Sequence, residues 1–128
     1  MKFVHTAIRV SDIEASKRFY IDGIGLEAKR EFTGDDGVLN FYVGGHEGAQ
    51  IQFKSDPGSE AEVRPEGVDH LAISVENVDR MVSQLSAEMG YTVVQEPTDM
   101  DEIRFAYVED PDGYRVELIQ SREERPSE

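Results

Sequence analysis

The sequence predicts an α+β protein made of two tandem βαβββ modules. The chain matches itself without a gap at an offset of 65 residues. The matched pairs include His5/His70, Ala7/Ala72, Val10/Val75, Gly25/Gly90, Tyr42/Tyr107 and Gly48/Gly113. Each half also begins with an alternating apolar segment, continues with a helical one and ends with three short strand-like segments. At 128 residues the chain has the length of one domain, in which both modules are expected to fold together.

The first module is expected to cover residues 1–54. An alternating strand at 3–10 is followed by Ser11 and Glu14, a capping-box pattern that begins a helix. This helix is expected to end near Ile21, before Gly23 and Gly25. Three further strands, separated by glycine-rich turns, are expected at 27–33, 38–43 and 49–54.

The same order is expected again after a polar linker at 55–67. The second module covers residues 68–122. Its first strand is expected at 69–75, and apolar residues at helical spacing predict a helix from Val78 to Met89, closed by Gly90. The remaining strands are expected at 91–95, 103–108 and 114–119. Residues 123–128 have the composition of a flexible acidic tail.

Composition excludes several classes of function. The chain has no cysteine, which excludes disulfides, thiolate metal sites and cysteine nucleophiles. Its net charge of −14 argues against nucleic acid as a partner and resembles the surfaces of halophilic proteins, which high salt screens. The segment MKFVHTAIRV is too interrupted for a signal peptide, and no apolar run is long enough to cross a membrane. The expected location is therefore cytoplasmic.

Four residues able to bind a metal ion occupy matched places in the two modules. His5 matches His70, and Gln52, near the end of the first module, matches Glu117, near the end of the second. Because strand side chains alternate between faces, all four are expected on the sheet face away from the helices, a polar and concave face. If a two-fold axis relates the modules, the four side chains converge on one point.

This set has the chemistry of an open metal site. Two imidazoles, an amide oxygen and a carboxylate suit Ni, Zn, Co, Mn or Fe(II), with room left for water or substrate oxygens. Such a site polarises a carbonyl or activates a bound water. A single strand histidine is usually just a half-buried residue, and the repeat favours the metal interpretation of the pair. Gln52 is the weakest candidate, because glutamine is a poor ligand and a common surface residue. Arg9, on the face of His5, either binds a substrate carboxylate or offsets local acidity.

Three segments resemble the glyoxalase I branch of the vicinal-oxygen-chelate superfamily. They are HTAIRVSDIEASKRFYIDGIGLE, HLAISV and FAYVEDPDGYRVELIQ. The resemblance covers nearly all of residues 1–122. It implies paired βαβββ modules that form a curved half-barrel around one divalent metal ion, with His5, Gln52, His70 and Glu117 as ligands.

The resemblance also implies an activity. Glyoxalase I isomerises the hemithioacetal of methylglyoxal and glutathione: a metal ion binds two substrate oxygens and stabilises an enediolate, while a carboxylate moves the proton. Glu117 stands at the position of that carboxylate. The resemblance implies a small-molecule substrate, a small thiol co-substrate and a homodimer.

Three positions depart from the glyoxalase I pattern. Gln52 stands where glutamate is usual, so a divalent metal ion with Glu117 alone keeps a charge of +1, which strengthens its Lewis acidity but removes one candidate base. Glu66 and Asp56 stand where glutathione-dependent members often have arginine and asparagine. Their charge would repel a glutathione carboxylate, which leaves the identity of the thiol open.

The departures leave other functions open. Gln at position 52 resembles methylmalonyl-CoA epimerases, which need two bases, and Asp35 falls near the position at which those enzymes have their second acid. His5, His70 and Glu117 alone would form the 2-His-1-carboxylate iron site of an extradiol dioxygenase. A non-catalytic binding protein of the bleomycin-resistance type is the remaining alternative, although such proteins typically lack the metal ligands that this chain keeps.

Overall fold

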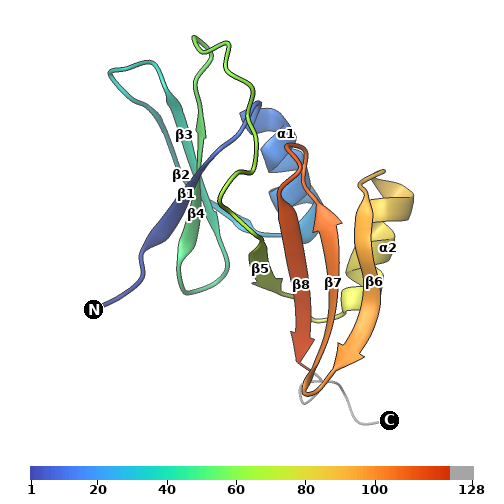
Figure 1. The fold of residues 1–128 in the computed structure, drawn as a ribbon. Helices are drawn as coiled ribbons and strands as arrows, with labels where there is room; N and C mark the ends of the chain where they lie inside the picture. Colours follow the sequence, from blue (N-terminus) through green and yellow to red (C-terminus); the bar gives the residue numbers. More distant parts are fainter. Residues whose placement is uncertain (122–128) are drawn as a thin grey trace. The chain divides into compact units, whose positions relative to one another are not determined.

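The computed structural model describes residues 1–121, and it divides the chain into two compact units. The first unit ends at Val63 and the second begins at Arg64, a division that falls inside the predicted linker. Each unit contains one four-stranded sheet and one helical segment, and the α+β class is confirmed (Figure 1). The predicted tail at 123–128 lies outside the described residues. No helix in residues 1–121 is both long enough and apolar enough to span a bilayer.

The first unit follows the predicted βαβββ order. Its elements are β1 (His5–Arg9), α1 (Ile13–Lys17), η1 (Arg18–Ile24), β2 (Glu27–Thr33), β3 (Leu39–Gly44) and β4 (Gln50–Ser55). The sheet order is β1-β4-β3-β2. The first and last strands of the unit pair in parallel, while β4 with β3 and β3 with β2 are antiparallel. The side chains of β1 therefore lie directly beside those of β4.

The second unit has the same topology. Its elements are β5 (Leu71–Ser74), α2 (Val78–Ser83), η2 (Gln84–Glu88), β6 (Val93–Met100), β7 (Ile103–Glu109) and β8 (Arg115–Ser121). The sheet order is β5-β8-β7-β6, and β5 pairs with β8 in parallel. Strand β6 is longer than the predicted strand at 91–95. It continues past Pro97 because it is an edge strand with register shifts between Val93 and Thr98, where a missing N–H is tolerated.

Both helical segments start with a side-chain cap and widen into a π-helical turn. Asp12, and not the predicted Ser11, caps α1, because its carboxylate accepts a hydrogen bond from the Glu14 N–H at 3.0 Å. Asn77 caps α2 in the same way. The last turns, η1 and η2, are π-helical. Gly25 ends η1 with a φ of 97°, in the left-handed region that favours glycine.

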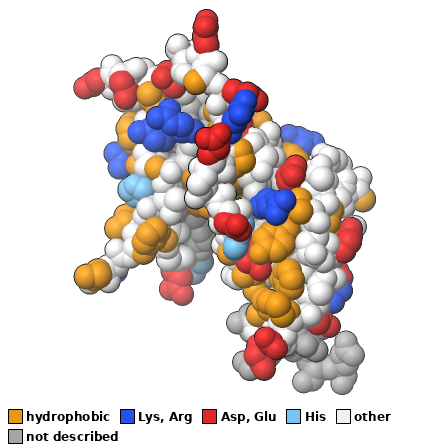
Figure 2. Space-filling model, viewed as in Figure 1, with side chains coloured by type: hydrophobic (Ala, Val, Ile, Leu, Met, Phe, Trp, Pro, Cys, Tyr) orange, Lys and Arg blue, Asp and Glu red, His pale blue; other side chains and the backbone are white. Residues whose placement is uncertain are grey.

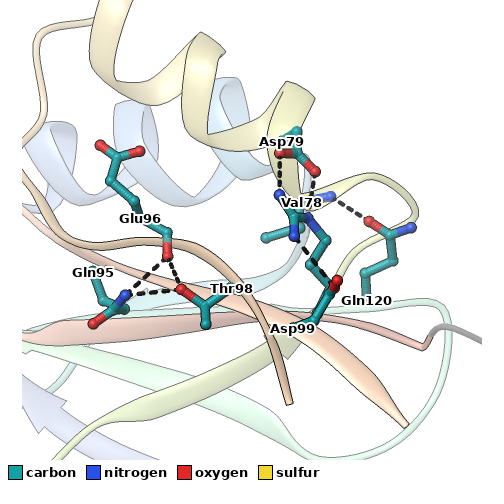
Figure 3. A network of polar contacts seen from close by, with 8 residues as sticks. Val78, Asp79, Gln95, Glu96, Thr98, Asp99 and Gln120 are labelled. Carbon is teal, nitrogen blue, oxygen red and sulfur yellow. Dashed lines mark hydrogen bonds and ion pairs between the residues drawn. The ribbon is translucent and has the colours of Figure 1, made fainter. Parts of the chain in front are cut away.

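Each unit has its own apolar core between the helix and one sheet face. In the first unit the Tyr20 and Phe53 rings lie 4.8 Å apart and are fully buried. In the second, Leu85 of η2 and Leu118 of β8 are fully buried. The Gln120 side chain also closes the second core, because its Oε1 accepts a hydrogen bond from the Val78 N–H at 2.8 Å (Figure 3). The opposite face of each sheet is predicted to be polar, but in the second unit it also has apolar residues, because Phe105 and Ile119 lie on the same face as Glu117.

The surface agrees with the acidic composition. Carboxylate side chains project from many separate places on the face shown in Figure 2, and basic side chains lie among them. Some carboxylates are paired. Lys17 lies between Glu14 and Glu31 at 3.4 and 3.1 Å. The surface therefore has no continuous basic stripe on this face for a phosphate backbone.

Candidate functional site

His5 and Gln52 lie on the same face of the first sheet. In the parallel pairing of β1 with β4, Ala7 is opposite Gln52 and His5 is opposite Gln50. His5 and Gln52 are thus diagonal neighbours, because residues two apart on a strand share a face. His5 is exposed, whereas Gln52 is buried, at 8% exposure. The structure therefore brings this predicted pair together.

The Gln52 amide belongs to a short chain of hydrogen bonds. Its Nε2 donates to Oδ1 of Asn40 at 2.9 Å, and Nδ2 of Asn40 donates to the Val38 carbonyl at 3.0 Å. Asn40 is buried, at 5% exposure. Ser16 Oγ is the one fully buried side-chain polar atom without a hydrogen-bond partner in residues 1–121. The Oε1 atom of Gln52 also accepts no hydrogen bond within residues 1–121 but is not fully buried, so it is accessible to solvent.

His70 and Glu117 form the corresponding pair in the second unit. His70 immediately precedes β5, and Glu117 lies opposite Ala72 in β8. His70 Nε2 is 3.3 Å from Oε1 of Glu117, whose side chain is only 12% exposed. His70 Nδ1 lies 2.7 Å from Oδ1 of Asp69. The hydrogen bond to His70, followed by the charge of that ring, lowers the pKa of Asp69. An ionised carboxylate can only accept a hydrogen bond, so Nδ1 is the donor toward Asp69.

A tyrosine packs against the histidine in each unit. The His5 and Tyr42 ring centroids are 5.5 Å apart with an interplanar angle of 89°, and those of His70 and Tyr107 are 5.4 Å apart at 87°. Each tyrosine is also opposite the second residue of its pair, Gln52 or Glu117. Burial, followed by the charge of Glu117, raises the pKa of Tyr107. Tyr107 therefore stays neutral at physiological pH, opposite Glu117 in the strand register.

Arg9 lies at the far end of the same face from His5. It is opposite Lys54 in the β1–β4 register. Both residues line a pocket of about 380 Å³ in the first unit, together with the carboxylates Asp36 and Asp56. The pocket thus combines two positive and two negative side chains, an arrangement suited to a ligand that has both charges.

The repeat indicates two of the residues that contact the predicted ligands, and it gives no sign of the other two. Tyr42 and Tyr107 match at the repeat offset, so the repeat already indicated that they have equivalent places. Asn40 and Asp69 have no matching partner in the other module, because their counterparts are Phe105 and Val4. Only the three-dimensional contacts identify them.

The donor atoms of the second unit fit a divalent cation. Since Nδ1 donates to Asp69, a neutral His70 presents a lone pair at Nε2, and this lone pair is 3.3 Å from a carboxylate oxygen. Two acceptors at this distance are stabilised by a cation or a proton between them. Within residues 1–121, no three His, Cys, Asp or Glu side chains form a group that could hold a metal ion. Each unit supplies two of the four predicted ligands.

Comparison with known proteins identifies relatives over almost the whole chain. The profile of the Glyoxalase/Bleomycin resistance protein/Dioxygenase superfamily matches residues 2–118. A probable lactoylglutathione lyase of Synechocystis sp. is 35% identical over 127 residues, 94% of this chain and 96% of the relative. The lactoylglutathione lyase of Haemophilus influenzae is 30% identical over 95% of this chain and 94% of the relative. The predicted resemblance to glyoxalase I is thereby confirmed.

Solved structures with the same fold agree. The trypanothione-dependent glyoxalase I of Leishmania major superimposes with a TM-score of 0.79 at 26% identity, covering 94% of this chain and 86% of that one. Glyoxalase I of Zea mays superimposes with a TM-score of 0.82 at 23% identity, which supports the fold alone; this chain spans 44% of the maize chain. The chain belongs to the Glyoxalase/Bleomycin resistance protein/Dioxygenase superfamily.

Proposed function

We propose that this protein is a divalent-metal-dependent lyase of the glyoxalase I type. It would isomerise the hemithioacetal formed by a 2-oxoaldehyde such as methylglyoxal and a small thiol. Relatives named lactoylglutathione lyase at 30 to 35% identity support this reaction class. The observation that carries the proposal is the His70–Glu117 pair, in which a ring nitrogen and a carboxylate oxygen lie 3.3 Å apart, a separation at which both can bind one metal ion.

The proposed ligands are His5, Gln52, His70 and Glu117. A metal-bound histidine usually donates its second ring N–H to a carboxylate or carbonyl, and His70 has this arrangement with Asp69 at 2.7 Å. The set contains no sulfur, and its nitrogen and oxygen donors suit Ni, Zn, Co, Mn or Fe. We propose that the two units act together, each supplying one histidine and one oxygen donor.

Glu117 is the proposed catalytic residue. The ion would supply Lewis acidity at the two neighbouring oxygens of the substrate. Glu117 would accept the proton from the carbon that bears sulfur and return it to the adjacent carbon. The hydroxyl proton on the first carbon would pass to the oxygen on the second, and the two transfers convert the hemithioacetal into a 2-hydroxythioester. The 12% exposure of its side chain limits proton loss to bulk water during this transfer. A hydrogen bond from Tyr107 would hold the Glu117 carboxylate in position.

We assign binding of the thiol to the pocket that contains Arg9. A thiol with an amino-acid head group has a carboxylate for Arg9 and Lys54 and an ammonium for Asp36 and Asp56. Asp56 in this pocket disfavours a thiol with further carboxylates. A small zwitterionic thiol is therefore the co-substrate that this pocket favours.

Three further properties belong to this proposal. We propose a homodimer, since Phe3 and Val4, beside His5, are 71% and 67% exposed and offer an apolar contact surface. We propose adaptation to high salt from the net charge of −14. We propose a cytoplasmic enzyme, because small thiols are kept reduced in that compartment. Sedimentation and a melting curve in increasing KCl test the first two.

The deciding experiment is thiol-dependent turnover of methylglyoxal before and after metal removal. Protein purified without a tag is stripped with a chelator and reloaded with each candidate ion. We expect activity with at least one thiol, its loss on stripping and its return on reloading. Turnover that survives complete stripping, or no turnover with any thiol and any ion, would contradict the proposal. Deuterium exchange into methylmalonyl-CoA without methylglyoxal turnover would indicate the epimerase instead.

A further inference from the structure

We propose that Asn40 is a positioning residue that makes Gln52 present its oxygen to the metal ion. This inference rests on the proposed ligand role of Gln52. A glutamine side chain has a donor end and an acceptor end of almost the same shape, and only the oxygen binds a metal ion. A glutamine ligand therefore needs neighbours that decide which end faces the site.

The hydrogen bonds around Asn40 fix this direction. The Val38 carbonyl can only accept, so the end of Asn40 that faces it at 3.0 Å is the donor, Nδ2. The other end of Asn40 is then Oδ1, which can only accept, and the end of Gln52 that faces it at 2.9 Å is Nε2. A backbone carbonyl thus sets the orientation of two side-chain amides in sequence, an orientation that shape alone does not determine.

Burial keeps this arrangement in place. Asn40 and Gln52 are 5% and 8% exposed, so water does not compete freely for their hydrogen bonds. Reversing either amide would bring two acceptors or two donors together. Strand β4 lies between β1 and β3, and Asn40 belongs to β3. An amide nitrogen directed at Asn40 therefore leaves the Gln52 oxygen turned away from β3.

The second unit provides the comparison that supports this role. At the repeat offset of 65 residues, Gln52 corresponds to Glu117 and Asn40 corresponds to Phe105. A carboxylate has two equivalent oxygens and needs no neighbour to select one of them. The polar neighbour is thus present in the unit whose ligand must be oriented and is replaced by an aromatic ring in the unit whose ligand need not be.

The test measures Ni²⁺ affinity of the full-length, metal-free protein by competition with a chelator. Asn40→Leu removes the acceptor while keeping the branched shape of the side chain, and we expect the affinity to fall about 10- to 100-fold. Asn40→Asp keeps an acceptor toward Gln52 but loses the bond to Val38; we expect a lower melting temperature with the affinity retained. Phe105→Leu is the matched control and should leave the affinity unchanged. Asn40→Ala replaces Asn40→Leu if that variant does not fold.

A double-mutant comparison separates positioning from a structural role. In the Gln52→Ala background, Asn40→Leu should cause no further loss of affinity, because the ligand it orients is gone. Asn40→Asp in the same background measures the effect of the added charge alone.

The outcomes distinguish the two proposals. Metal uptake by the wild type that is unchanged in Asn40→Leu, or a loss that persists in the Gln52→Ala background, overturns the role of Asn40 alone. No metal uptake by the wild type overturns both proposals.

Discussion

The two units have the same ring contact at their histidines but different neighbours around it. His5 meets Tyr42, and His70 meets Tyr107, at centroid distances of 5.5 and 5.4 Å and almost perpendicular planes. His70 also has a carboxylate near each ring nitrogen, Asp69 at 2.7 Å and Glu117 at 3.3 Å. At the corresponding places the first unit has Val4 and Gln52.

This difference indicates how the two copies divide the chemistry. The repeated residues are those that build the backbone and hold the histidine rings, and the residues that carry charge differ. The second unit concentrates the negative charge, while the first unit supplies a neutral amide that needs Asn40 to orient it. In the proposed assignment, the second unit supplies the charged ligand and the base, and the first unit supplies a neutral oxygen donor. Substitutions that make one unit resemble the other test this division.

The largest effect is expected when Glu117 is made like its counterpart. Glu117→Gln removes the proposed base at constant size, and turnover should fall about 10²- to 10⁴-fold, the usual contribution of general acid–base catalysis. Steady-state kinetics on metal-saturated protein measure this. Bound metal is determined in the same samples, so that a loss of the ion is not mistaken for a loss of the base.

The opposite change makes Gln52 like its counterpart Glu117 and tests whether a carboxylate in the first unit has the same effect. Gln52→Glu adds a carboxylate to the first unit and should tighten metal binding while keeping turnover within about tenfold of the wild type. The double exchange, Gln52→Glu with Glu117→Gln, should remain slow, because the first unit has no counterpart of Asp69. Full activity in the double exchange would mean that the units are interchangeable.

A smaller effect is expected at Asp69. Asp69→Val gives His70 the neighbour that His5 has, and the Nδ1–H loses its acceptor. Partners of this kind typically contribute 10- to 100-fold in metal affinity, and we expect a loss of about that size. Chelator competition measures it, and Asp69→Asn is the graded control. Affinity as tight as that of the wild type would show that Asp69 does not orient the ring.

The two units also differ in the hydrogen bond that ties the start of the helix to the last strand, and this difference should appear in the free energy of unfolding. Gln120→Leu leaves the buried Val78 N–H without an acceptor and should lower the free energy of unfolding by about 1–3 kcal/mol. Ser55, its counterpart, has a longer hydrogen bond of 3.3 Å to the Ser11 carbonyl. Ser55→Ala should cost about 0.5–1.5 kcal/mol. Urea unfolding of both variants tests the order, and an equal or larger loss for Ser55→Ala would contradict it.

The sequence was sufficient for the fold because the pattern occurs twice. Alternating apolar residues and matched glycines located all eight strands to within a few residues at most ends. The largest error was β6, which was predicted at 91–95 but extends to Met100, because an edge strand with register shifts accommodates Pro97. The π-helical turns had no sequence signal, since they depend on how each helix packs.

The candidate site was predictable only in part, for a similar reason. The repeat selects His5, His70, Gln52 and Glu117, and strand alternation puts each pair on one face, as in the structure. Their role as metal ligands stays a prediction. The sequence does not indicate Asn40 or Asp69 as neighbours of the ligands. Each contacts a ligand through one hydrogen bond, which depends on the local backbone and on the direction of a side chain.

The smallest expected effect concerns the ion pairs that join helix to sheet. In the second unit Arg104 contacts both Asp79 oxygens, at 2.8 and 2.9 Å, and Asp99 at 3.2 Å. Leu39 is its counterpart in the first unit. Arg104→Leu should cost about 0.2–1 kcal/mol at low salt, because the two carboxylates are largely exposed.

Salt should change the contribution of the Arg104 ion pairs to stability, whereas pH should not. In 1 M KCl, where the screening length is about 3 Å, the difference between Arg104→Leu and the wild type should shrink, even though the proposed halophilic chain as a whole becomes more stable. The hydrogen bond to Asp79 raises the pKa of Arg104. A raised pKa in the folded protein stabilises it at every pH below the usual pKa of arginine, and this stabilisation is lost only at higher pH. Arginine titration should therefore not change the difference between pH 6 and pH 9. A difference that is as large in 1 M KCl as in dilute buffer would mean that Arg104 acts through packing of its side chain against α2, not through its charge.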